Sequence, residues 1–148
     1  MGAAYFYHLT ETPMDRTLPM LLGKATEAGW RVLVRGNDPA LLERMDQLLW
    51  QDGFMPHGVA GGPHDADQPI LFGAGVPATG FDCVMSIAGA EVTADEINAA
   101  ERTCILFDGY DEAALNFARG QWKTLTDAGC TAQYWAQEDG RWLKKAEK

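Results

Sequence analysis

The amino-acid sequence predicts an α/β fold in which a mostly parallel sheet is flanked by helices. Short apolar runs, which fit buried strands, alternate with longer segments whose apolar residues recur every three or four positions, as on one helix face. The connections between these elements are short, as in parallel sheets covered by helices. No internal repeat or long linker interrupts the pattern, so residues 1–148 are predicted to form a single domain.

The first strand and the first helix are predicted near the amino terminus. Residues 3–7 form a short aromatic run typical of a strand. Thr12 as N-cap and Pro13 in the first turn then begin a helix, which Gly29 ends. The apolar face of this helix is predicted to face the sheet and consists of Leu18, Leu21, Leu22 and Ala25.

The same alternation is repeated once more along the chain. Residues 30–35 predict a second strand, and Asp38 with Pro39 begins a second helix that runs to Trp50. The segment 58–69 is rich in glycine, proline and aspartate, and is predicted to be a loop. Further short apolar runs predict buried strands at residues 70–72, 83–87 and 104–107.

The carboxyl-terminal part predicts a long helix, an edge strand and a basic segment. Acidic pairs at 95–96 and 111–112 are interpreted as helix-start charges that favour the helix dipole. The second pair begins a long helix, which Gly129 ends. Residues 131–135 predict an edge strand, and a basic segment follows from about residue 136.

Composition excludes several classes of protein. A hydrophobic fraction of 47% with 10% aromatic residues excludes a disordered or fibrous chain. No apolar run approaches the roughly 20 residues that cross a bilayer, and the first residues lack the basic flank of a secretion signal; a cytoplasmic location is therefore expected. Cys83, Cys104 and Cys130 are odd in number and widely spaced, which predicts buried free thiols rather than disulfides or a zinc site.

The distribution of charge is more informative than its sum. A net charge of −9 argues against a surface that binds nucleic acid directly, because phosphate contacts need local Lys and Arg side chains. Residues 119–148 nevertheless contain six of the twelve cations and only four of the twenty-one acids. An acidic body with a basic carboxyl-terminal part favours an acidic partner. A solvated basic tail is the alternative interpretation.

The sequence predicts no catalytic, cofactor-binding or metal-binding residue. Gly73 and Gly75 follow a predicted strand, as in a dinucleotide fingerprint, but a strand is predicted next instead of the helix that would receive the pyrophosphate. His64, Asp65 and Asp67 could ligate a metal, although such loops are more often exposed turns. The single serine lies outside any Gly-x-Ser-x-Gly motif.

Two groups of residues are candidate interaction sites. The first contains Trp50, Phe54, Pro56 and His57, which follow the second predicted helix. Aromatic side chains at a helix end either pack inward or mark an interface, where aromatic anchors are enriched. Both interpretations stay open from these residues alone.

The second group lies on the long helix near the carboxyl end. Arg119, Trp122 and Lys123 have spacings of three and four residues, so they share one face. A tryptophan between two cations suits a ligand that is both apolar and anionic, such as an acidic peptide ending in a hydrophobic residue. The alternative is that Trp122 packs inward with Leu115, Ala118 and Leu125 while the cations are solvated.

Taken in order, several segments resemble the chi subunit family of DNA polymerase III. The most specific is Phe54-Met55-Pro56-His57-Gly58. The others are found at residues 5–9, 29–34, 48–50, 68–71, 101–102, 118–119, 122–123 and 128–129. Together they cover nearly the whole chain in a matching order and spacing.

This resemblance implies a Rossmann-like sheet without a nucleotide and a non-catalytic role in DNA replication. Members of the family bind the acidic carboxyl-terminal tail of single-stranded DNA-binding protein, which ends in phenylalanine. In some bacteria they also pair with the psi subunit and so join the clamp loader. The resemblance therefore implies protein partners, with no direct contact to nucleic acid or membrane.

The resemblance also assigns both candidate groups. It places Arg119, Trp122 and Lys123 on the helix that binds the acidic tail, with Trp122 where the family often has tyrosine. A family lysine one turn before Arg119 is replaced by Leu115. The region that faces psi corresponds to Trp50, Phe54, Pro56 and His57. The alternative function is a nucleotide- or small-ligand-binding enzyme of the same architecture, with its site near residues 36–38 or 73–75.

Overall fold

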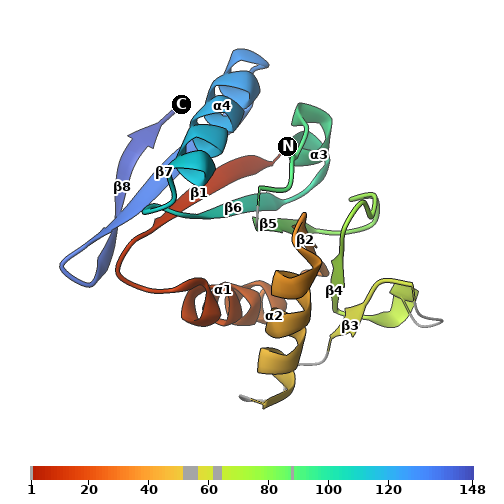
Figure 1. Ribbon diagram of the computed structural model, residues 1–148. Helices are drawn as coiled ribbons and strands as arrows, with labels where there is room; N and C mark the ends of the chain where they lie inside the picture. The colour runs from red at the N-terminus through yellow and green to blue at the C-terminus, as the bar shows by residue number, and fades with distance from the viewer. Residues whose placement is uncertain (1, 52–56, 62–64, 88) are drawn as a thin grey trace.

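In the part of the chain that the structure describes, the protein folds around one sheet of eight strands in the order β3-β4-β2-β5-β6-β1-β7-β8 (Figure 1). The computed structural model describes residues 2–51, 57–61, 65–87 and 89–148. The strands are β1 (Ala3–Leu9), β2 (Val32–Gly36), β3 (Gly58–Val59), β4 (Ile70–Gly73), β5 (Cys83–Ile87), β6 (Arg102–Asp108), β7 (Thr131–Glu138) and β8 (Arg141–Glu147). All paired strands are parallel except β7 and β8. The predicted α/β class with a mostly parallel sheet is confirmed.

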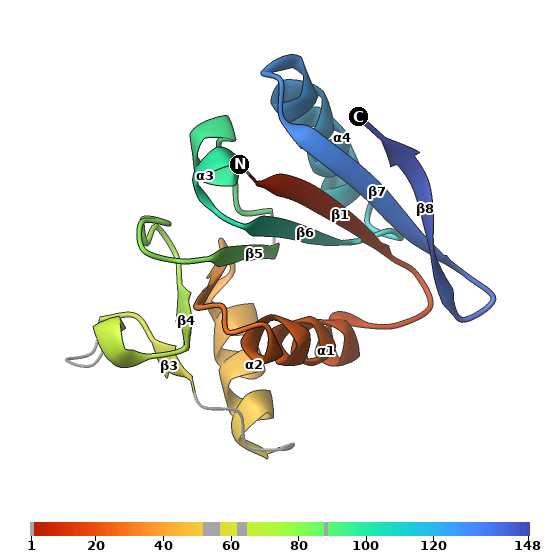
Figure 2. The same ribbon diagram turned by 180° about the vertical axis from the view of Figure 1, so that it is seen from behind.

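Helices cover both faces of the sheet (Figures 1 and 2). The helices are α1 (Met14–Glu27), α2 (Pro39–Gln51), α3 (Ala94–Ala99) and α4 (Glu112–Asp127), with a short 3-10 turn, η1, at Asp65–Asp67. Side chains alternate along each strand. In β1, Tyr7 and Leu9 therefore join the core beneath α1 and α2, whereas Ala4 and Phe6 join the core beneath α3 and α4.

Helix α3 was not predicted as a separate element, although its acidic pair was interpreted as a helix start. Thr93 and Glu96 form a reciprocal capping box at its first turn. The Glu96 carboxylate also accepts two hydrogen bonds from the Arg35 guanidinium, at 2.6 and 2.9 Å. These bonds tie α3 to the end of β2, and the Arg35 contact is the main reason why the pKa of Glu96 is lowered.

The carboxyl-terminal segment is more ordered than a tail. β7 is flanked by β1 and β8, so the predicted edge position of residues 131–135 is wrong, and β8 forms the edge instead. The basic segment from about residue 136 forms the end of β7 and all of β8. Asp139 and Gly140 connect the two strands with φ values of 52° and 75°, as the tight turn of an antiparallel hairpin requires.

The three cysteines are free and buried, as the sequence predicts. Within the described residues no helix is long and apolar enough to span a membrane.

Candidate functional site

Helix α4 is fixed to the sheet by buried contacts along one face. Asp111 caps the amino terminus of α4. Its carboxylate accepts hydrogen bonds from the backbone N–H groups of Ala113 and Ala114, at 3.0 and 3.2 Å. Ala118 and Leu125 lie in the core beneath the helix. The side-chain carbonyl oxygen (Oε1) of the buried Gln121 accepts a hydrogen bond of 3.1 Å from the backbone N–H of Val92, which joins α4 to the segment before α3. The helix therefore presents its other residues from a rigid support.

Trp122 contributes to the core and to the surface. Its ring lies edge-on to Phe6 at 5.3 Å and to Tyr134 at 5.9 Å between centroids. The side chain is half-buried and packs against the cluster beneath α4. The inward-packing interpretation of Trp122 is thus correct in part, because the ring packs inward without being fully covered. A ligand would meet it as a fixed aromatic wall.

Arg119 lies one turn before Trp122, and its side chain is exposed. Among the described residues it has no ion pair or hydrogen bond. Its charge nevertheless acts on two neighbours: it lowers the pKa of His8, and it opposes the rise in the pKa of Tyr134 that burial causes. Arg119 is therefore close to the carboxyl-terminal part of β1 and to the middle of β7.

Lys123 is exposed but already has a partner. Its Nζ donates a hydrogen bond of 2.8 Å to the Asp127 carboxylate, one turn further along α4. This contact raises the pKa of Lys123 and lowers that of Asp127. Such an exposed pair is weak and is screened by salt. An anionic ligand at Lys123 would have to compete with Asp127.

His8 and Tyr134 complete the surface beside Arg119, and the sequence analysis assigned no site role to either of them. His8 Nδ1 and the Tyr134 hydroxyl form a hydrogen bond of 2.8 Å. The His8 ring also lies 5.2 Å from the Phe107 ring. Burial is the main reason why the pKa of His8 is lowered, with Arg119 second, so the imidazole is mostly neutral at pH 7.

The parallel register of β1 and β7 brings His8 and Tyr134 together. This register pairs Phe6 with Tyr134, and His8 follows on the same face of β1. The pairing joins segments more than a hundred residues apart and could not be read from local patterns. On the resulting surface Arg119, which has no ion pair or hydrogen bond within the described part of the chain, lies beside the aromatic rings of Trp122, Tyr134 and His8. This surface can bind a group that is both apolar and anionic.

The second candidate group lies at the other end of the sheet, around the end of α2. The Trp50 side chain is 45% exposed, and its ring lies 4.3 Å from the ring of His57. His57 is buried, and its Nε2 donates a hydrogen bond of 2.7 Å to the Asp46 carboxylate. The structure thus joins Trp50 and His57, with His57 as the buried support. Phe54 and Pro56 lie outside the described residues.

The two places where the sequence offers a nucleotide site, near residues 36–38 and 73–75, do not form a site of the dinucleotide type within the described residues. β5 is the next regular element after Gly73 and Gly75, so the helix that follows this turn in a dinucleotide fingerprint is replaced by a strand. At α2, the Asp38 carboxylate accepts hydrogen bonds from the N–H groups of Ala40 and Leu41 and so occupies the helix start itself. The described residues contain no group of three His, Cys, Asp or Glu side chains suited to a metal.

Comparison with known proteins agrees with the residues that carry the resemblance. A family model described as "DNA polymerase III chi subunit, HolC" matches residues 1–133. The matched segment extends from the first strand into β7 and contains all seven predicted site residues. β8 and Tyr134, which lies beside Arg119 and Trp122 of α4, are outside the matched segment. A comparison with curated proteins gives no match.

Proposed function

The chain belongs to the chi subunit family of DNA polymerase III, and from this premise we propose that it binds the acidic carboxyl-terminal tail of single-stranded DNA-binding protein. The family supports an accessory role in DNA replication. In the proposed role the protein is a non-catalytic adaptor in the cytoplasm, which connects the polymerase or clamp loader to protein-coated single-stranded DNA. It contacts the coating protein and not the DNA.

One observation carries this proposal: Arg119, an exposed cation that has no ion pair or hydrogen bond among the residues that the structure describes, lies beside the fixed, half-buried ring of Trp122. Arg119 can donate paired hydrogen bonds to a carboxylate, either the terminal one or that of an aspartate. A terminal phenylalanine ring can pack on Trp122 and Tyr134, which already form an edge-to-face pair. The net charge of −9 does not prevent this contact, because residues 119–148 contain six cations and four acids.

The expected affinity follows from these contacts. Burial of a phenylalanine side chain contributes about 1.5–3 kcal/mol, and each charge-assisted hydrogen bond contributes roughly 1.5–3 kcal/mol before the cost of ordering the peptide. With the two paired bonds of Arg119, the sum is about 4.5–9 kcal/mol before that cost, so micromolar binding, which corresponds to about 8 kcal/mol, is the tightest scale we expect. The family lysine that Leu115 replaces would have added a further cation, so the affinity should lie at the weak end for this kind of site.

We also propose that the surface formed by Trp50 and its buried neighbour His57, here called the Trp50 surface, binds the psi subunit and thereby the clamp loader. The exposed indole and its buried support at His57 give a rigid aromatic anchor. This surface is separate from α4, so both partners could bind at the same time.

The test is a calorimetric titration with a short acidic peptide ending in Ile-Pro-Phe. A peptide of equal charge that lacks the phenylalanine is the control. We expect micromolar binding by the first peptide, loss of binding with the second, and weaker binding as salt screens the charges. Absence of heat from a protein shown to be folded by circular dichroism would contradict the proposal.

A further inference from the structure

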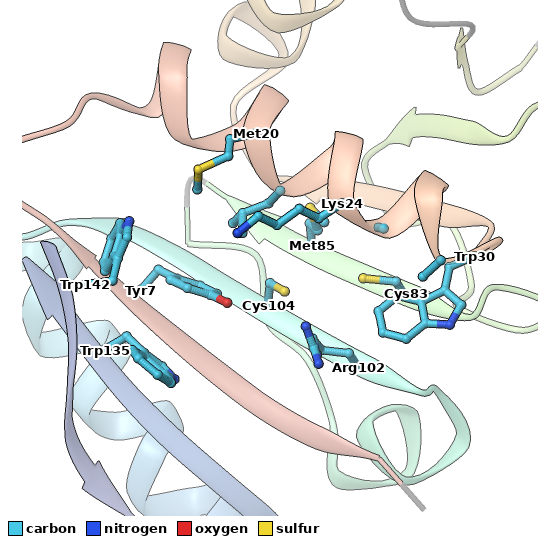
Figure 3. A pocket seen from close by; sticks show the side chains of 13 residues that line it. Tyr7, Met20, Lys24, Trp30, Cys83, Met85, Arg102, Cys104, Trp135 and Trp142 are labelled. Atoms are coloured by element: carbon cyan, nitrogen blue, oxygen red, sulfur yellow. The ribbon is translucent and has the colours of Figure 1, made fainter.

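A third binding feature lies on the opposite face of the sheet from α4. A cavity of about 490 Å³ opens between α1 and the strands β1, β5, β6 and β7 (Figure 3). Its size is within the range of small-molecule sites, roughly 300–1,000 Å³. On one side the cavity is bounded by α1, including Met20 and Leu21, and on the other by Trp142 of β8, which packs against Tyr7 of β1. It shares no residue with the proposed peptide site.

Flat aromatic side chains form the walls of this cavity. Tyr7, Trp30, Trp135 and Trp142 all line it. The rings of Tyr7 and Trp142 lie edge-on at 5.3 Å, and the Trp135 Nε1 donates a hydrogen bond of 3.0 Å to Gln133, so these rings are held in place. The floor consists of apolar atoms from Met85 and its neighbours in β5 and β6. Such walls favour a flat apolar ligand.

The charge of the lining has one sign. Lys24 and Arg102 line the cavity, and no Asp or Glu does, although acids outnumber cations by twenty-one to twelve in the whole chain. The Arg102 guanidinium lies over the rings of Tyr5 and Trp30, at 4.4 and 5.2 Å from their centroids. Among the described residues neither cation forms an ion pair or a side-chain hydrogen bond. Their N–H donors are therefore available to a ligand.

The placement of these groups fits one ligand class. Figure 3 shows the ends of Lys24 and Arg102 and the Tyr7 hydroxyl between Trp30 on one side and Trp135 with Trp142 on the other. We propose that this cavity binds a small planar aromatic anion, with its ring against the tryptophans and its acidic group at Arg102 and Lys24. This site extends the protein beyond a purely protein-binding role and is independent of the function proposed for α4.

The tryptophans provide a direct test. The chain contains five, of which Trp30, Trp135 and Trp142 line the cavity while Trp50 and Trp122 lie elsewhere. In ¹H–¹⁵N spectra of the full chain, titration with 2-naphthoate should shift the three lining indole N–H signals to saturation and leave the other two unchanged. The neutral analogue 2-naphthamide should bind at least about tenfold more weakly, because it lacks the charge that the cations attract.

Charge variants make the test specific. Lys24→Gln lies at an exposed helix position and should weaken 2-naphthoate binding by about tenfold without loss of folding. Arg102→Gln should weaken it further, and Arg16→Gln, which removes a cation of α1 outside the lining, should leave it unchanged. Equal binding of both naphthalene probes, shifts spread over all five indoles, no saturable shift, or unchanged binding by Lys24→Gln would each overturn the proposal.

Discussion

At the scale of single residues, the α4 surface depends on which charges already have partners. Arg119 has no ion pair among the described residues, whereas Lys123 is held by Asp127 at 2.8 Å. The sequence assigned both cations the same role from their spacing. Spacing could predict the shared helix face and also the difference between the two cations, because Asp127 follows Lys123 at i+4 on the same helix.

Removal of the free cation should weaken tail binding most. We expect Arg119→Ala to weaken binding of the acidic peptide by about tenfold or more, since it removes a charge-assisted hydrogen bond worth roughly 1.5–3 kcal/mol. Titration calorimetry of the folded variant measures this loss. Arg44→Ala removes an exposed cation of α2 and is the matched control, for which the affinity should not change. Unchanged affinity in an Arg119→Ala and Lys123→Ala double variant would contradict the site assignment.

Asp127 should act as a competitor of the ligand. Asp127→Asn removes the carboxylate that holds Lys123, so we expect the peptide to bind a few-fold more tightly at low salt and about equally at high salt. The same variant should lower the pKa of Lys123, because the Asp127 contact is what raises it. A weaker affinity in this variant would show that Asp127 positions Lys123 for the ligand.

His8 reports the charge at Arg119. Burial and then Arg119 lower the pKa of His8 below its ordinary value of 6.5, while Asp108 acts in the opposite direction. The unfolded chain therefore takes up this proton at a higher pH than the folded one, and His8 destabilises the fold as the pH drops below about 6.5. In NMR titrations Arg119→Ala should raise the pKa of His8. An unchanged pKa would place Arg119 too far from β1 to take part in the site.

At the scale of elements, continuous apolar runs were sufficient to predict the buried strands, and polar or short elements were missed. β2, β4, β5 and β6 are almost entirely buried, so their composition identifies them. β8 is mostly exposed and polar, so it resembled a basic tail. Helix α3 buries only Ile97 and has six residues, too few for an apolar period. Both depend on partners that the local sequence does not show.

Helix α3 should depend on Glu96 for its position. Glu96→Gln breaks the ion pair with Arg35 and weakens the capping box, so we expect the free energy of unfolding at pH 7 to fall by about 1–3 kcal/mol. The pKa of Glu96 is lowered in the fold, so the carboxylate stabilises the protein above its ordinary value of 4.5 and this contribution is lost as the pH falls further. Urea unfolding at pH 7 and at pH 3 measures both effects. An equal deficit at the two pH values would exclude the ionic contribution.

At the scale of the whole molecule, three surfaces lie apart on one rigid sheet: α4, the end of α2, and the cavity beneath α1. The sequence predicted the first two from neighbouring residues. It could not predict the third, because the cavity collects side chains from α1, β1, β5, β6, β7 and β8. The same reason explains why His8 and Tyr134 were missed at α4. A site within one helix can be predicted from the spacing of its residues. A site formed by several strands can be predicted only when the order of the strands in the sheet is known.

The separation of the surfaces makes them independent in binding. We expect Trp50→Ala to reduce co-purification of a co-expressed psi subunit from the same genome while peptide binding at α4 stays within about twofold, as for sites far apart. Because Trp50 is exposed, we expect this change to leave the fold intact, and a thermal melt checks it. Equal recovery of psi by the wild type and the variant would remove Trp50 from that interface.

The strand order also determines when during synthesis the fold can close. β1 is the first strand made, yet both of its neighbours, β6 and β7, belong to the last third of the chain. Until β7 has left the ribosome, β1 lacks one of its two neighbouring strands. The pairing of β1 with β7 also joins residues that are separated by most of the sequence. A nascent chain that stops before β7 therefore exposes the edge of β1, with Phe6 and Tyr7, to chaperones and to aggregation. The sheet around β1 is therefore completed only when the last strands of the chain have been made.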